Sequence, residues 1–266
     1  MAEKYDALVI GGGPAGSVLA QLLARAGWSV ALLEAKRFPR RKVCGEYLSA
    51  TNWPLLESLG IAGLFRQMAG PEVRRVGLIA ADTSLSADIS RPQEARECGR
   101  ALSREKLDTL LLNRARDVGV EVRQPWAAAG LAREGEVFLC HATCKESRAK
   151  AELIAPIVIA AHGSWEAGAL PTQTKQQPKR PGELFAFKAH FLNCALPDDL
   201  MPLLAFPGGY GGMVRSDSGR VSLSCCIRRD ALQKIRRTRG LSAGEAVLAH
   251  ILQSCSALRP IFSAAV

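Results

Sequence analysis

The residues with the most definite chemistry are three glycines near the N-terminus. Gly11, Gly13 and Gly16 follow the apolar run Ala7–Ile10 and open a segment whose apolar residues recur at helical spacing. In this arrangement the first glycine permits a tight turn and the second lets a pyrophosphate approach the main chain. The third lets the helix pack closely on the strand. The first N–H groups of such a helix also attract phosphate oxygens. The spacing therefore predicts a dinucleotide-binding turn.

A carboxylate stands where the sugar of such a nucleotide would lie. Glu34 ends the predicted strand Ser29–Leu33, which follows the predicted helix. At this place a carboxylate accepts hydrogen bonds from both ribose hydroxyls, and its negative charge disfavours a 2′-phosphate. NAD and FAD share the ADP half that these residues would hold. The strand–helix–strand unit by itself therefore leaves the choice between the two cofactors open.

A basic loop follows this unit and ends in Cys44-Gly45-Glu46. Basic side chains beside a pyrophosphate form charge-assisted hydrogen bonds, so Arg41 and Lys42 are candidates to hold the middle of the cofactor. We expect solvated surface positions for the remaining basic residues of the loop, Lys36, Arg37 and Arg40.

A helix and a strand are predicted further along the chain. Leu102–Leu111 has leucines on one helical face, with Ser103 as the expected N-cap and Gly119 as the end of the helix. Arg104 lies in the first turn, off the leucine stripe. The segment Val120–Arg123 continues as a strand.

At this point the sequence resembles the flavoproteins of the p-hydroxybenzoate hydroxylase fold. The likeness is greatest to the branch of geranylgeranyl reductase-like oxidoreductases, FAD-dependent monooxygenases and halogenases. It covers three segments: Tyr5–Ala35, Arg41–Ser49 and Leu102–Val122.

The resemblance implies FAD, bound in an extended form, as the cofactor. It implies that Ala15, Glu34, Cys44 and Gly45 touch FAD, with the Cys-Gly loop near the flavin end. It also implies that Arg104 contacts the phosphate or ribose region of the cofactor.

We therefore expect an α/β fold with a Rossmann-like FAD-binding βαβ sheet in residues 1–164 and a β-rich substrate domain in residues 165–266. Leu131–Ala142 and Ala151–Ala161 predict a small antiparallel insertion, and Ile157–Ala161 is expected to return as a buried strand to the parallel sheet. Two or three antiparallel strands, among them Leu184–Leu192 and Val221–Ile227, are expected in the substrate domain. The resemblance implies that Tyr210, in a Gly-Gly-Tyr segment, faces the active site.

Two features depart from the family pattern. His162 stands where family members usually have the acid of an Asp-Gly pair, and we expect it to be structural rather than catalytic. The family's third cofactor motif, which begins with Gly-Asp, has no counterpart in the sequence. The C-terminal part of the family fold is therefore expected to be absent.

Composition excludes several classes of protein. The chain has 266 residues and a formal net charge of +10, but its basic residues are scattered, so anionic small ligands are favoured over nucleic acid. No run approaches the roughly 18 apolar residues of a membrane span. Eight irregularly spaced cysteines indicate a reducing, cytoplasmic setting. Cys140 and Cys144 are interpreted as packing residues of a strand, so no metal site is predicted.

The sequence predicts an FAD-dependent oxidoreductase, either a monooxygenase or halogenase or a geranylgeranyl reductase-like enzyme, acting on a small organic or lipid-like substrate. The flavin would perform the chemistry, so no catalytic residue is assigned, and any NAD(P)H would bind transiently. The main alternative is a non-catalytic or truncated fragment that keeps only the ADP-half site. A minor alternative is an ordinary NAD-dependent dehydrogenase.

Overall fold

The computed structural model describes residues 2–89, 97–163, 167–168, 170–173, 180–239 and 241–265. The chain divides into two compact units. Unit 1 comprises Met1–Arg41, Leu59–Ile61 and Arg104–Gln177, and unit 2 comprises Lys42–Ser58, Ala62–Ser103 and Pro178–Val266. The expected domain boundary at residue 164 stays a prediction. Among the described residues, no helix combines the length and the apolar character needed to cross a bilayer.

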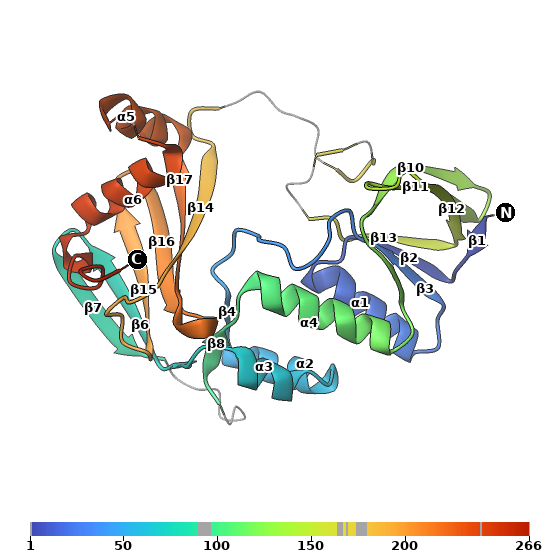
Figure 1. Ribbon diagram of the computed structural model, residues 1–266, viewed down its shortest axis with the longest axis horizontal. Coiled ribbons are helices and arrows are strands. Elements are labelled where there is room, and N and C mark those ends of the chain that lie inside the picture. The colour runs from blue at the N-terminus through green and yellow to red at the C-terminus, as the bar shows by residue number, and fades with distance from the viewer. Residues whose placement is uncertain are drawn as a thin grey trace. The chain divides into compact units, whose positions relative to one another are not determined.

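Unit 1 is built on a parallel sheet with the strand order β13-β2-β3-β9. The bounds are β2 Ala7–Ile10, β3 Val30–Leu33, β9 Glu121–Arg123 and β13 Ile157–Ala160. Helices α1 (Pro14–Arg25) and α4 (Arg104–Asp117) lie side by side in this unit (Figure 1). They pack on one face of the sheet through a buried cluster that includes Val9, Leu32 and Leu112. The predicted strand–helix–strand unit is confirmed.

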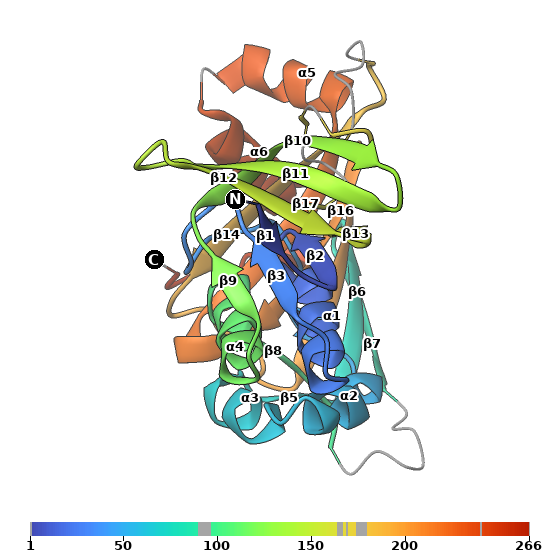
Figure 2. The ribbon, with the colours of Figure 1, turned by 90° about the vertical axis from the view of Figure 1, so that its right-hand side faces the viewer.

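A second sheet of unit 1 packs on the opposite face of the parallel sheet (Figure 2). Its strand order is β1-β12-β11-β10. The bounds are β1 Glu3–Lys4, β10 Trp126–Glu134, β11 Val137–Cys144 and β12 Lys150–Ala155. Strands β10, β11 and β12 pair antiparallel, so the predicted insertion is confirmed. Cys140 and Cys144 are both buried on β11, as packing residues should be.

The strand β13 differs from its prediction in one respect. It pairs in parallel with β2, as expected, but Ile157 and Ala160 are exposed rather than buried. The reason is its place at the end of the strand order, where only one of its edges has a partner strand among the described residues.

Unit 2 contains a six-stranded sheet with the order β14-β17-β16-β15-β6-β7. The bounds are β6 Arg75–Ala80, β7 Thr83–Asp88, β14 Leu184–Phe191, β15 Leu200–Phe206, β16 Gly209–Arg215 and β17 Val221–Arg228. Neighbouring strands are antiparallel except for β15 and β6, which are parallel. The expectation of two or three antiparallel strands in residues 165–266 was too low, because β14, β15, β16 and β17 all lie there, and β6 and β7 join the same sheet from a distant part of the chain.

Two helices contribute to the core on one face of this sheet, α5 (Arg229–Arg239) and α6 (Ala243–Ser254). The main buried residues of this core come from alternate positions of the strands and from the helices: Ile79, Leu204, Phe206, Met213, Leu223, Cys225, Ile227, Leu232, Val247 and Ile251. Residues between these positions on the strands point to the other face, which the helices do not cover.

The remaining elements of unit 2 are short. Strands β4 (Tyr47–Leu48), β8 (Gly99–Ala101) and β5 (Glu72–Val73) form a three-stranded sheet in that order. Helices α2 (Trp53–Ser58) and α3 (Ala62–Met68) meet through an edge-on contact between Trp53 and Phe65, whose ring centroids are 5.5 Å apart.

Candidate functional site

Two of the three predicted glycines in unit 1 are required by the fold itself. Gly11 has φ +113°, a conformation that side chains disfavour, and a Cβ there would lie 2.4 Å from the carbonyl oxygen of Ala161. A Cβ on Gly16 would lie 1.9 Å from the carbonyl oxygen of Gly11. These two glycines allow the turn after β2 and the close packing of α1 on that turn.

Gly13 is different, because nothing in the fold requires a glycine there. Its φ of −68° is open to any residue, and it occupies the N-cap position of α1. A Cβ would have no neighbour closer than 3.7 Å, and its two neighbours would be the guanidinium groups of Arg40 and Arg104. A Cβ would thus be in ordinary van der Waals contact with two cationic groups, and the glycine keeps the main chain at the start of α1 free of a side chain beside them.

Glu34 lies at the carboxyl end of β3, next to this turn, and is buried. Its Oε2 accepts a hydrogen bond from the Gly12 N–H at 2.9 Å, and its Oε1 accepts one from the Lys36 N–H at 2.9 Å. A carboxylate offers about four acceptor positions, so the group retains capacity for the hydroxyls of a bound sugar.

Arg40 is largely buried, with 13% of its side chain exposed. Its Nη2 lies 3.8 Å from Glu34 Oε2 and 3.6 Å from Asp108 Oδ2. Its Nε and Nη1 are buried and have no hydrogen-bond partner within the described part of the chain. Buried donors without partners are rare and costly, and here they belong to a cation whose Nη2 lies beside Gly13. The arrangement fits an anionic ligand.

Asp108 organises the two arginines. It is fully buried on α4 and accepts two hydrogen bonds from Arg104, from Nε at 2.6 Å and from Nη2 at 2.9 Å. The two residues stand at i and i+4 on the helix, the spacing that brings side chains together. Arg104 is thus held beside Gly13.

The other predicted residues of unit 1 lie at the surface. Ala15 is exposed in the first turn of α1. Arg41 has 84% of its side chain exposed and forms an ion pair with Glu105. The expectation that Arg40 is a solvated surface charge was wrong, because Phe38, Glu34 and Asp108 enclose its guanidinium group.

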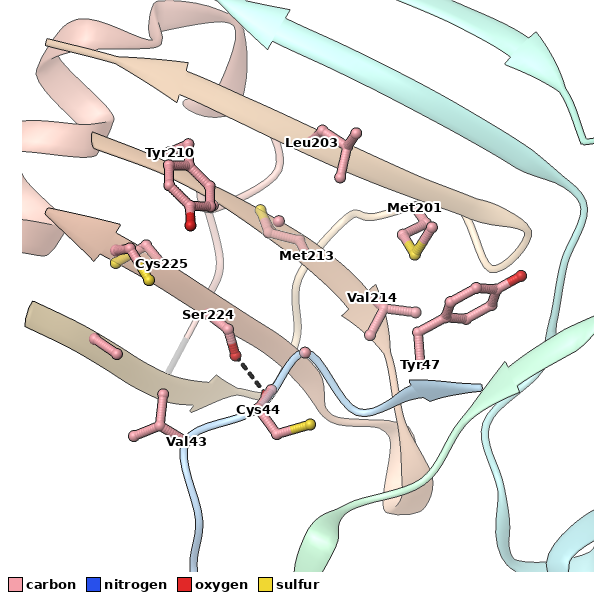
Figure 3. Close-up of a pocket in the computed structure, with 15 residues that line it drawn as sticks. Val43, Cys44, Tyr47, Met201, Leu203, Tyr210, Met213, Val214, Ser224 and Cys225 are labelled. Carbon is pink, nitrogen blue, oxygen red and sulfur yellow. Dashed lines mark hydrogen bonds between the residues drawn. The ribbon is translucent and has the colours of Figure 1, made fainter. Parts of the chain in front are cut away.

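Unit 2 contains a cavity of about 400 Å³ on the sheet face that α5 and α6 do not cover (Figure 3). Cys44 and Gly45, two of the predicted residues, form part of its wall. The lining is mostly apolar and includes Val43, Tyr47, Met201, Leu203, Tyr210, Gly212, Val214, Ser224 and Cys226.

The wall segment around Cys44 is tied to the sheet. The Ser224 hydroxyl on β17 donates a hydrogen bond to the Cys44 carbonyl oxygen at 2.7 Å (Figure 3). The Glu46 carbonyl oxygen accepts a hydrogen bond from the Leu102 N–H at 3.1 Å. These two bonds fix the main chain on either side of Gly45.

Glu46 forms a buried ionic cluster with two residues of β14. Its carboxylate binds Lys188 Nζ and lies 3.2 Å from His190 Nε2. Burial acts to raise the pKa of the Glu46 carboxyl, but the hydrogen bonds and charges of Lys188 and His190 act against burial and hold the pKa below its ordinary value. Glu46 also has φ +65°, a conformation uncommon outside glycine, which this cluster maintains.

Tyr210 is exposed and lines the cavity, as the resemblance implied for a residue facing a substrate. A hydrogen bond with the Cys226 thiol on the neighbouring strand raises the pKa of Tyr210 above its ordinary value. The cavity wall therefore carries thiol, hydroxyl and aromatic groups but no carboxylate among the residues that line it.

Two further residues, His162 and Ser103, form hydrogen bonds within the protein. The ring nitrogens of His162 bind the Gly163 carbonyl oxygen and the Thr172 hydroxyl, both at 2.9 Å, which suits the structural role expected for it. Ser103 does not act as the N-cap that the sequence predicted. Its hydroxyl has no hydrogen-bond partner among the described residues, while its N–H donates to Asp217 Oδ1 at 2.9 Å.

Sequence reasoning missed the role of Asp108 and of the cluster at Glu46. A signal existed for each. Asp108 stands four residues after Arg104 on a predicted helix, and Lys188 and His190 interrupt an apolar strand at alternate positions, so both point to one face.

Comparison with known proteins agrees with this geometry. A family model described as an FAD binding domain matches residues 4–252. Among curated relatives, digeranylgeranylglycerophospholipid reductase 1 of Methanothermobacter thermautotrophicus is 34% identical over 168 residues, which is 61% of this chain and 40% of that protein. Menaquinone reductase of Mycolicibacterium smegmatis is 32% identical over 123 residues, which is 46% of this chain and 29% of that protein.

Solved structures share the fold. The myxobacterial chondrochloren halogenase CndH, an FAD-dependent halogenase, has a TM-score of 0.83 at 23% identity over 99% of this chain and 61% of its own. A geranylgeranyl bacteriochlorophyll reductase-like protein of Thermoplasma acidophilum has a TM-score of 0.74 at 19% identity. The match covers 100% of this chain and 64% of that protein's chain. The chain thus spans less than two thirds of each of these proteins. The predicted α/β fold and resemblance are confirmed: the chain belongs to the FAD binding domain family, with FAD as the cofactor.

Proposed function

We propose that this protein is an FAD-dependent oxidoreductase that acts on a small organic or lipid-like substrate. The observation that carries the proposal is the glycine at position 13, which the backbone geometry does not require and beside which two guanidinium groups lie. A diphosphate bound there would meet main-chain N–H groups at the start of α1 and the Nη2 atoms of Arg40 and Arg104, which lie beside Gly13.

The residues of unit 1 bind the ADP half of the cofactor in this proposal. Glu34 accepts hydrogen bonds from the ribose, while Gly11 and Gly16 maintain the turn. Arg40 and Arg104 neutralise the diphosphate, and Asp108 holds both guanidinium groups in place. From the resemblance we also assign a contact with FAD to Ala15, and from the charge of the basic loop we assign one to Arg41; both residues are exposed.

The cavity of unit 2 is proposed to take the substrate, with Cys44 and Gly45 contacting the flavin end of the cofactor. Bound FAD supplies hydride or oxygen chemistry. The chain's own residues orient the substrate and keep water away from it, since the lining is largely apolar. Tyr210 donates its phenolic proton in a hydrogen bond and offers a ring face for stacking.

The proposal also covers the type of reaction, the electron donor and the cellular compartment. Relatives include reductases and halogenases by name, and both a reductase and a monooxygenase or halogenase agree with an apolar cavity. A nicotinamide donor would bind transiently. All eight cysteines are free thiols, which supports a reducing, cytoplasmic setting and excludes no other.

The test is FAD binding by the purified full chain and by Gly13→Val, measured by isothermal titration calorimetry. We expect the parent to bind FAD and ADP, and we expect the variant to lose at least 100-fold in affinity for both because the valine fills the space for the diphosphate. Thermal unfolding of the variant checks that it is folded, because the valine methyl groups extend beyond a Cβ that would already lie 3.7 Å from Arg40.

Gly63→Val is the matched control. Gly63 is exposed on α3, and no heavy atom lies within 4 Å of the position that a Cβ would take there, so this variant should bind FAD like the parent. Equal FAD affinity of Gly13→Val and the parent would refute the proposal. If the parent binds FAD no more tightly than ADP, the result supports the alternative, a fragment with only the ADP-half site.

A further inference from the structure

Gly212 lies in the interior of a central strand, where the fold does not require a glycine. Strand β16 pairs with β15 and with β17, and both pairings pass through Gly212 without a bulge. Its backbone does not adopt a positive φ. A Cβ there would come no closer than 3.4 Å to any atom beyond its two chain neighbours, which is an ordinary van der Waals distance. Glycine weakens the interior of a strand, and it often marks a place where a ligand approaches the main chain.

Two other glycines of the same strand have reasons within the fold. A Cβ on Gly209 would lie 2.3 Å from the ring of Phe206, and a Cβ on Gly211 would lie 2.7 Å from a carbonyl oxygen of β17. Gly212 is on the open face of the sheet, because it precedes Met213, which belongs to the buried core on the opposite face. Of these three glycines, Gly212 is therefore the one whose missing side chain enlarges the cavity instead of avoiding a collision.

Four side chains surround the bare main chain at Gly212. Tyr210 and Val214 stand two positions before and after it on the same face of β16. Leu203 on β15 and Ser224 on β17 are its partners in register. All four line the cavity (Figure 3). Val214 is 3% exposed and packs against other elements of unit 2, so that end is closed. Gly212 thus forms the floor of a depression with walls on four sides.

The shape of this floor indicates what can occupy it. Leu203 and Ser224 stand on strands two intervals of about 4.8 Å apart, and Tyr210 and Val214 are about 13 Å apart along the strand. The floor is therefore compact in both directions, and the peptide planes that form it are flat. A planar ring brings a whole face into contact with such a surface, and the ring of Tyr210 at the rim is placed for an edge-to-face contact with it.

We propose that Gly212 is a specificity-determining residue, whose missing side chain lets a planar ring of the substrate lie against the main chain of β16. This inference rests on the proposed function and names the group that the substrate carries. The Cys44 carbonyl oxygen is bonded to Ser224, the neighbour of Gly212 on β17, so the bound ring lies beside the segment assigned to the flavin end of the cofactor.

Two alcohols with the same carbon skeleton test the fit of a planar ring. 2-Naphthol is flat, whereas decahydro-2-naphthol is puckered, and burial of apolar area alone would give them similar affinities. We would measure 2-naphthol binding to the full chain by its fluorescence, and decahydro-2-naphthol binding by displacement. The parent should prefer 2-naphthol by about tenfold.

Gly212→Ala should remove this preference. Its methyl group would stand between the ring and the main chain, so the affinity for 2-naphthol should fall by about tenfold, while the affinity for decahydro-2-naphthol should change by less than about threefold. The temperature of thermal unfolding should not fall, because the added Cβ makes only ordinary contacts and alanine restricts the unfolded chain more than glycine does.

Gly77→Ala is the matched control. Gly77 lies on β6, is not among the residues that line the cavity, and would also place a Cβ no closer than 3.4 Å to another atom. It should bind both alcohols like the parent. Equal affinities of the parent for the two alcohols, or a Gly212→Ala variant that behaves like the control, would overturn the inference. So would loss of 2-naphthol binding at saturating FAD, because the flavin itself would then occupy the floor. FAD titration without the alcohols tests the proposed function separately, since the 2-naphthol readout needs no flavin.

Discussion

The Ser224 hydroxyl and the Cys44 carbonyl oxygen are 2.7 Å apart, although 180 positions separate the two residues in the sequence. This hydrogen bond joins β17 of the sheet to the segment that forms the cavity wall. It acts together with the ionic cluster at Glu46, so the wall is anchored by one neutral and one charged contact. The position of Cys44 therefore depends on residues of two strands that are distant in the sequence, β14 and β17.

Ser224→Ala should loosen this wall without unfolding the protein. A buried hydrogen bond contributes about 1 kcal/mol, so the free energy of unfolding should fall by about that amount in urea denaturation. The Cys44 thiol should react with iodoacetamide several times faster, as measured by mass spectrometry of the peptide that contains it. Ser86→Ala, on the exposed strand β7, should leave both values unchanged. An unchanged labelling rate in Ser224→Ala would show that the bond does not hold the wall.

Glu46→Gln should destabilise unit 2 in a way that depends on pH. At pH 7 the variant leaves Lys188 buried without its counter-charge, so the free energy of unfolding should fall by about 3 kcal/mol. The pKa of Glu46 is lowered in the folded state, and the stability it confers is therefore complete above the ordinary value of 4.5 and is lost as the pH falls through the lowered pKa.

The difference between Glu46→Gln and the parent should accordingly be largest at neutral pH and should shrink below about pH 4.5. Urea denaturation at pH 7, 5 and 4 measures it. Glu57→Gln, an exposed change on α2, should stay within about 0.5 kcal/mol of the parent at each pH. A gap that stays constant down to pH 4 would contradict the ionic role of Glu46.

Much of unit 1 could be predicted because the residues that determine its structure are neighbours in the sequence. The apolar run Ala7–Ile10, the glycine turn and Glu34 lie close together in sequence, and each has one physical reason. Strands β6 and β7 could not be predicted in the same way. The residues of β7 alternate serine with leucine and alanine. Strand β7 pairs with β6, and β6 pairs on its other edge with β15, which is more than a hundred residues away in the sequence.

The site shows the same limit at the level of single residues. Gly13 and Glu34 were found because the turn itself gives them a role. Choosing between Arg40 and Arg41 was beyond the sequence, because adjacent basic residues of an irregular loop have no periodicity to show which one points inward. Asp108 and Glu46 decide the geometry only after the chain has folded, by supplying charges from other elements.

Arg40→Gln and Arg41→Gln form a matched pair that tests which arginine binds the diphosphate. Arg40 has buried donors without partners, and each charge-assisted bond contributes about 1.5–3 kcal/mol, so ADP affinity should fall between 10-fold and 150-fold. The exposed Arg41 side chain already pairs with Glu105, so its variant should lose less than threefold. Calorimetry with ADP in low salt measures both. The reverse order of the two losses would assign the diphosphate to Arg41.

Asp108→Asn tests whether the Asp108 carboxylate and a bound diphosphate interact with the same two arginines. The change removes the buried carboxylate that Arg104 binds at two atoms and leaves Arg40 with Glu34 alone, so the free energy of unfolding should fall by about 3 kcal/mol. A bound diphosphate supplies the missing negative charge, and saturating ADP should therefore restore more stability in the variant than it adds to the parent. Urea denaturation with and without ADP measures this difference. Asp117→Asn, at the exposed end of α4, should change neither value. If ADP stabilised Asp108→Asn less than the parent, the aspartate would act by orienting the arginines rather than by balancing their charge.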